Sequence, residues 1–168
     1  MPSTYEKIAT TTLGSAAASY TFSSITGTYT DLVLISNVDV TSAGASINIR
    51  FNSDTGSNYS YTTLYGNGSA AASTRGSNLT ASYIAAYVAP NTALETVIIT
   101  NIQNYSNATT NKTFISRSNR ASASNSPGAE ALVGLWRSTS AITSITLAAD
   151  SGNLDTGCTF TLYGILKA

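Results

Sequence analysis

The chain has 168 residues, a formal net charge of zero and only 10% charged residues, far below the quarter that is usual in soluble proteins. A length of this order suits one domain that buries roughly 70% of its unfolded surface. A neutral surface does not attract nucleic acid, and no apolar run approaches the ~20 residues of a membrane span. We therefore expect neither a nucleic-acid partner nor a membrane partner.

The composition indicates a folded sheet protein with a hydroxyl- and amide-rich surface. Ser and Thr together number 51, Asn adds 14, and there are ten Tyr and four Phe. Disordered chains are poor in aromatic and β-branched residues, whereas strands are rich in them. The low charge also leaves little repulsion between copies, which favours an assembled state but equally fits a compositional bias of the source.

Alternation of apolar and polar side chains predicts about eleven short strands and no amphipathic helix. In the fourth of them Ile47, Ile49 and Phe51 are expected to point inward, with Asn48 and Arg50 outward. The predicted strands are 5–13, 19–25, 30–40, 45–51, 59–65, 80–88, 94–102, 111–120, 131–137, 141–149 and 158–165. The apolar run inside 30–40 predicts a strand covered on both faces.

Three further segments are interpreted from their composition. Residues 1–14 are polar and are expected to form an extended N-terminal arm or a first strand. Residues 66–78 and 121–128 consist mainly of small residues and predict long surface loops, which often make contacts in assemblies.

The stretch 136–165 holds two alternating runs separated by Gly152, Asn153 and Gly157, and it predicts a hairpin that closes a larger sheet. The many short strands and frequent turns predict an all-β protein. We expect a single-domain antiparallel β-sandwich over 15–168, jelly-roll-like, preceded by the arm.

Catalytic chemistry has little support. The chain has no His and only one Cys, which removes the commonest general base and any thiolate metal cluster. Asp54 lies in a segment resembling the start of a calcium loop, but the required downstream acid is missing, so a turn is favoured. Asp150 and Asp155 are interpreted as loop-tip residues, and Cys158 as a small buried side chain. We expect no enzyme activity, catalytic residue, metal or cofactor.

The locally basic segment contains Lys112, Arg117 and Arg120. An edge strand protected by charge is the plainer interpretation, and contact with an acidic patch on a neighbouring subunit is the functional one. Tyr59, Tyr61, Tyr65 and Trp136 present a similar choice. They form either a ladder packed into the sandwich, which is favoured, or a platform for sugars.

Several segments together resemble small β-sandwich structural proteins of tailed bacteriophage virions, especially those of cyanobacterial phages. The matching segments are TYTDLVLI (28–35), FNSDTGSNYS (51–60), NKT (111–113), WRSTSAITSITL (136–147) and GCTFTLYGI (157–165). The resemblance implies a non-enzymatic virion component with a jelly-roll-like fold.

On this basis we expect a capsid decoration, or cement, protein that binds the outside of the head and bridges major capsid subunits. Symmetric copies are expected, with a trimer favoured. The alternative is a tail-fibre or tail-tip protein that binds host surface glycans. The expected location is the capsid surface of the virion, after synthesis in the host cytoplasm. The residues expected to contact the partner are Tyr5, Lys7, Arg75, Lys112, Arg117 and Arg120.

Overall fold

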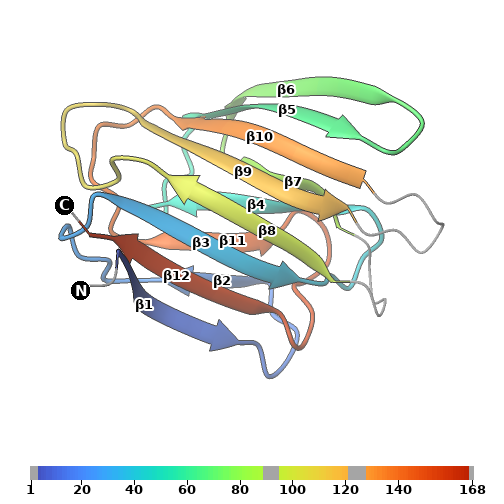
Figure 1. The fold of residues 1–168 in the computed structure, drawn as a ribbon, viewed down its shortest axis with the longest axis horizontal. Coiled ribbons are helices and arrows are strands. Elements are labelled where there is room, and N and C mark those ends of the chain that lie inside the picture. The colour runs from blue at the N-terminus through green and yellow to red at the C-terminus, as the bar shows by residue number, and fades with distance from the viewer. Residues whose placement is uncertain (1–3, 89–94, 121–127, 167–168) are drawn as a thin grey trace.

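The computed structural model describes residues 4–88, 95–120 and 128–166, and within these ranges it contains twelve strands and no helix (Figure 1). The strands are β1 (Tyr5–Thr12), β2 (Ser19–Phe22), β3 (Asp31–Val38), β4 (Ala45–Phe51), β5 (Tyr59–Gly66), β6 (Ala71–Leu79), β7 (Ser82–Val88), β8 (Thr96–Ile102), β9 (Lys112–Arg120), β10 (Gly128–Trp136), β11 (Ile145–Ala149) and β12 (Thr159–Ile165). They form two sheets that pack face to face, so the predicted all-β antiparallel sandwich is confirmed.

The order of the strands is that of a jelly roll with one sheet enlarged. The large sheet has the order β1-β12-β3-β8-β9-β10-β5-β6, and the small sheet has the order β2-β11-β4-β7. As in a jelly roll, consecutive strands lie in different sheets, and the chain crosses from one sheet to the other between them. This holds for β1 and β2, β3 and β4, β7 and β8, and β11 and β12. The inserted strands β5, β6, β9 and β10 lengthen the large sheet beyond β8, and β7 packs across β9 and β10.

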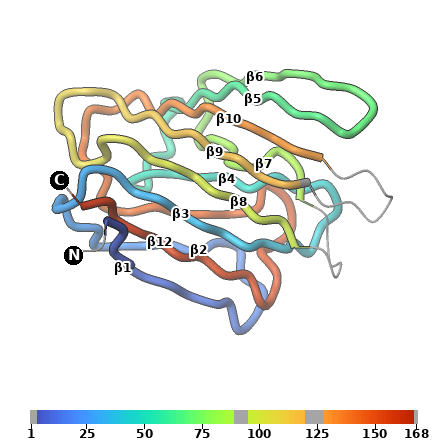
Figure 2. The backbone as a smooth tube through the Cα atoms, viewed as in Figure 1, coloured from blue at the N-terminus to red at the C-terminus, as the bar shows by residue number. Residues whose placement is uncertain are grey.

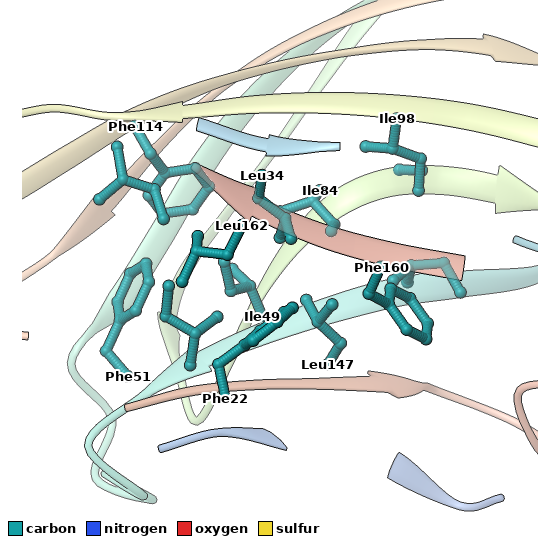
Figure 3. Close-up of a cluster of buried hydrophobic side chains, with 14 of the residues drawn as sticks. Phe22, Leu34, Ile49, Phe51, Ile84, Ile98, Phe114, Leu147, Phe160 and Leu162 are labelled. Carbon is teal, nitrogen blue, oxygen red and sulfur yellow. The ribbon is translucent and has the colours of Figure 1, made fainter. Parts of the chain in front are cut away.

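Alternation along the strands fills the space between the sheets. Figure 3 shows Leu34, Ile98 and Phe160 from the large sheet facing Ile49 and Leu147 from the small sheet. All five are fully buried. The inward positions predicted for the fourth strand are confirmed, because every second side chain of a strand points to the same face.

The hairpin predicted at 136–165 is wrong. β11 pairs with β2 and β4 in the small sheet, whereas β12 pairs with β1 and β3 in the large sheet. The segment between them crosses the end of the sandwich, and its buried Leu154 forms bridges with Ala17 and Val40. Alternation shows which side chains point inward, but it does not reveal which strand pairs with which.

The surface loop predicted at 66–78 is also wrong in large part. Only a short turn follows β5, in which Asn67 Oδ1 accepts hydrogen bonds from the amides of Ser69 and Ala70, and Gly68 has φ +84°. The chain then returns as β6, paired with β5. Small residues have weak strand propensity, so pairing with β5 determines this strand.

In the predicted N-terminal segment, Tyr5–Thr12 forms a strand, the second of the two alternatives, and residues 1–3 lie outside the described ranges. β1 pairs with β12 along the edge of the large sheet (Figure 2). The amide of Leu166 donates to the carbonyl of Thr4 over 3.0 Å. Of the loop predicted at 121–128, residues 121–127 lie outside the described ranges, and Gly128 begins β10.

Candidate interaction face

Large hydrophobic side chains are exposed on one face of the molecule. Within the described ranges six such side chains are exposed, by 38% to 61% of their surface: Tyr5, Ile35, Leu64, Val97, Ile115 and Val133. Five of the six have a buried residue beside them in the same strand, so they point away from the small sheet. The sixth, Tyr5, pairs with Ile165, which alternates with the buried residues of β12 and therefore lies on the same outer face. We call this side of the eight-stranded sheet the apolar outer face.

Strand register brings these side chains side by side. One row across the sheet runs through Ile35, Ile99, Arg117, Ala131 and Leu64, each directly paired with the next. Directly paired residues in a sheet have side chains on the same face. Aliphatic side chains of four strands therefore share one row, with a single charged residue, Arg117 of β9, in the middle of it.

The neighbouring row has basic residues at both ends. Its members, in order across the sheet, are Lys7, Tyr163, Val33, Asn101, Ile115, Val133, Thr62 and Arg75. Val33 is 5% exposed whereas Ile35, two residues along the same strand, is 38% exposed. The strand was predicted to be buried on both faces, and on its outer face this is true of Val33 but not of Ile35.

The outer face of the small sheet has a different character. There Thr146 pairs with Thr21 on one side and with Arg50 on the other, and Ala148 pairs with Asn48. The hydroxyls of Thr21 and Thr146 are hydrogen-bonded to one another at 2.9 Å. The outer face of the small sheet is thus polar, whereas that of the large sheet exposes large hydrophobic side chains among polar ones. Exposed hydrophobic side chains gathered on one face are typical of an interaction site.

The apolar outer face contains a shallow hollow of about 710 Å³ over β10, β5 and β6. Small side chains create it, because Ala71, Ala129 and Ala131 lie where bulkier residues stand on β3 and β8. Leu64 and Arg117 are among the residues that line it. The face thus offers both projecting aliphatic groups and a recess.

Four of the six residues predicted to contact a partner lie on this face, at its two edges and near its middle. Tyr5 and Lys7 pair with the outward residues of β12, Arg75 lies on β6, and Arg117 lies on β9. Lys7, Arg75 and Arg117 are exposed, and none forms an ion pair with another described residue. Sequence reasoning selected them individually and did not predict that register would gather them.

Lys112 does not belong to this group. It points into the sandwich and is fully buried, and its amine donates to the carbonyls of Thr110 and Thr139 at 2.7 and 3.1 Å. Desolvation by this burial lowers the pKa of Lys112. The predicted partner contact is corrected to a structural role. Arg120 ends β9, and its side chain lies outside the described residues.

The edge strand proposed for the basic segment is also corrected. β9 lies inside the large sheet, with β8 on one side and β10 on the other. Arg117 therefore does not protect an open edge. It stands on the flat of the sheet, between Ile99 and Ala131.

The favoured structural interpretations of the aromatic residues hold for Tyr59 and Trp136. Tyr59 and Trp136 are buried, their rings stack with centroids 6.3 Å apart, and both pack on Phe51. Tyr61 is half-buried against Tyr83, with ring centroids 5.0 Å apart. Burial raises the pKa of Tyr59 to about 12. These rings serve packing between the sheets and do not form an exposed sugar platform.

The segment around Asp54 is a turn, as predicted. One carboxylate oxygen accepts from the indole of Trp136 at 2.7 Å and from the amide side chain of Asn58 at 2.8 Å, and the other accepts from the backbone of Gly56. These hydrogen bonds, with that from Trp136 the strongest, lower the pKa of Asp54. The carboxylate thus joins the turn between β4 and β5 to Trp136 at the end of β10.

Other titratable groups are likewise used in the structure. Cys158 is 2% exposed, and desolvation raises the pKa of its thiol, which agrees with the predicted role as a small buried side chain. Asp150 accepts from the backbone of Ser46, and Asp155 from that of Thr156. In the described part of the chain no three His, Cys, Asp or Glu residues are grouped as a metal site would need, and no helix there is long and apolar enough to cross a membrane.

Comparisons with known proteins add little. No protein-family model matches the chain, and no curated protein matches it. Among solved structures it is similar to a chain in the structure of infectious bursal disease virus Gt strain, with 14% identity and a TM-score of 0.20. That match covers 94% of this chain and 42% of the viral chain, so the present chain spans less than half of that protein.

Proposed function

We propose that the protein is a virion structural protein, a capsid decoration protein that docks on the major capsid protein through its apolar outer face. The observation that carries the proposal is the concentration of all six exposed large hydrophobic side chains on that face. Contiguous apolar surface of this kind marks an interaction site on a soluble domain. The resemblance of five sequence segments to phage virion proteins supports the choice of partner.

The geometry suits attachment to a shell. The face of an eight-stranded sheet offers a wide area for apolar contacts, of the kind found in the core of a protein interface. The opposite, hydroxyl-lined face of the small sheet would then face solvent. Copies arranged as a trimer around a symmetry axis of the shell would each make the same contacts. Binding of the linked copies together would be tighter than binding of one copy alone.

The test is re-attachment to heads of the encoding virus that have been stripped of this protein. Val133→Asp and Ile115→Asp each place a charge in the apolar outer face, and we expect binding to fall at least about tenfold because a buried, unpaired carboxylate is costly. Thr146→Asp on the small sheet is the matched control and is expected to bind normally.

Electron microscopy with a gold-labelled antibody gives the location of the protein on whole virions. Label on the head surface supports decoration. Label confined to the tail contradicts it and favours the tail-fibre alternative, and normal binding of both Asp variants contradicts the assigned face.

A further inference from the structure

Arg117 is the one charged residue within the aliphatic row of the apolar outer face. It lies between Ile99 on β8 and Ala131 on β10, and it borders the hollow lined by Leu64, Ala129 and Ala131. It makes no ion pair with any other described side chain. When a partner covers this face, the guanidinium loses its water and needs an acceptor.

The described acids near the sheet do not meet this need. Glu130 points inward, where it accepts hydrogen bonds from Thr63 and from the backbone of Ala86 at 2.7 and 2.8 Å. Asp31 lines a second hollow together with Arg117, but it makes no ion pair with it, and its carboxylate accepts from the backbone of Asn104. Glu95 accepts from the side-chain amide of Asn37. No described acid is paired with Arg117, which leaves its guanidinium open to an acceptor on a partner.

We propose that the partner surface presents a carboxylate next to a bulky apolar side chain, the carboxylate pairing with Arg117 and the apolar group filling the adjacent hollow. This rests on the proposed docking function and names the chemistry that the capsid surface supplies. Arginine pairs with a carboxylate through two parallel N–H···O bonds, which determine position and orientation together. The hollow of about 710 Å³ is large enough for a side chain such as Leu, Phe or Tyr.

A second copy of the chain fits this position less well. A two-fold contact through the centre of the face would bring Arg117 against its own equivalent. Lys7 and Arg75, at the two ends of the neighbouring row, add further positive charge to the same face. Like charges across an interface cost several kcal/mol, so charge complementarity favours an acidic partner.

The experiment uses the same stripped heads and places a lysine at the position of the arginine. Arg117→Lys keeps the charge, and a carbodiimide then joins the new amine to a carboxylate in contact with it, taking up one water as the amide forms. We expect a cross-link between position 117 and an Asp or Glu of the capsid protein. Arg50→Lys, on the polar outer face of the small sheet, is the matched control and should form none.

Two further variants measure affinity. Arg117→Gln, which removes the charge from an exposed site, and Ala131→Trp, which fills the hollow, are each expected to weaken binding to heads at least about tenfold. Circular dichroism and thermal melts show whether each variant remains folded.

The possible outcomes separate the two proposals. Failure of the wild-type protein to bind heads contradicts the proposed function itself. Binding by the wild type that is unchanged in Arg117→Gln, or that gives no cross-link at position 117, overturns the carboxylate while leaving the docking function standing. A cross-link from position 117 to a second copy of the chain would show self-association and would also overturn it.

Discussion

At the scale of single residues, the charged side chains divide into those that hold the fold and those left for a partner. Asp54 and Lys112 are fully engaged with neighbours, whereas Lys7, Arg75 and Arg117 are exposed without ion pairs among the described residues. Because the chain has so few charged residues, this division separates the charged side chains that stabilise the fold from those that do not. Two predictions test it.

Asp54 is expected to make stability depend on acid. Its folded pKa lies below the ordinary value of 3.8, so its contribution is complete above that value and is lost as the pH falls through the folded pKa. Asp54→Asn should cost about 0.5–1.5 kcal/mol at neutral pH, because charge-assisted hydrogen bonds weaken while solvent screens the partly exposed carboxylate.

Urea denaturation at pH 7 and near pH 3 measures the effect. The difference between wild type and Asp54→Asn should shrink at the lower pH, whereas Asp155→Asn, whose carboxylate bonds to the adjacent Thr156 amide, should show a small cost at both. A cost for Asp54→Asn that is independent of pH would contradict the assigned role of its charge.

Lys112 is expected to be structural although it is a lysine. Lys112→Ala empties a buried site and leaves the carbonyls of Thr110 and Thr139 without their donor, and we expect a loss of about 2–4 kcal/mol. Lys7→Ala, an exposed control, should change stability by less than about 0.5 kcal/mol. Chemical denaturation of both variants makes the comparison, and equal costs would refute the distinction.

At the scale of elements, close packing within strand pairs determines how the inner face is filled. Gly134 on β10 pairs directly with Phe114 on β9, and the ring of Phe114 lies over it. A Cβ added at Gly134 would stand 1.9 Å from the Phe114 ring. The glycine is therefore needed for space, and its backbone is that of an ordinary strand.

Gly134→Ala is expected to cost about 1–3 kcal/mol through overpacking. Phe114→Leu removes the ring, so the double variant should recover part of the loss, giving a favourable coupling energy in a double-mutant cycle. Thermal or urea unfolding of the four proteins supplies the numbers. Additive costs would show that the two positions do not compete for the same space.

At the scale of the whole molecule, one core joins the two sheets. The buried cluster contains residues of both sheets without interruption, among them Leu34 of β3 and Ile49 of β4. Neither sheet covers its own apolar face, so each depends on the other for burial. The sandwich should therefore unfold as a unit.

Leu34→Ala and Ile49→Ala are each expected to lower stability by about 2–5 kcal/mol. Each should still unfold in a single transition, since loss of packing on one sheet removes cover from the other. Calorimetry together with circular dichroism measures this. Two separate transitions in either variant would show that the sheets are independent.

The sequence predicted much of the strand content because alternation is a local property of the chain. The strand 45–51 was placed at its observed bounds, and Trp136, Tyr59 and Cys158 were correctly assigned to the interior. The apolar outer face also left a signal, since the adjacent apolar residues at 32–35 and 97–99 exceed what a strand with one solvated face needs. That signal was interpreted for the first run only.

Which strand pairs with which could not be predicted from the sequence. The strands β11 and β12 are neighbours in the chain but lie in different sheets, and β6 is a strand because β5 lies beside it. The same holds for the candidate site, whose residues come from seven strands. Alternation alone determined which side chains point inward. The register between distant strands decided that Lys7, Arg75, Arg117 and the exposed aliphatic groups share one face. The reason is that hydrogen-bond pairing across a sheet depends on contacts between residues far apart in the chain.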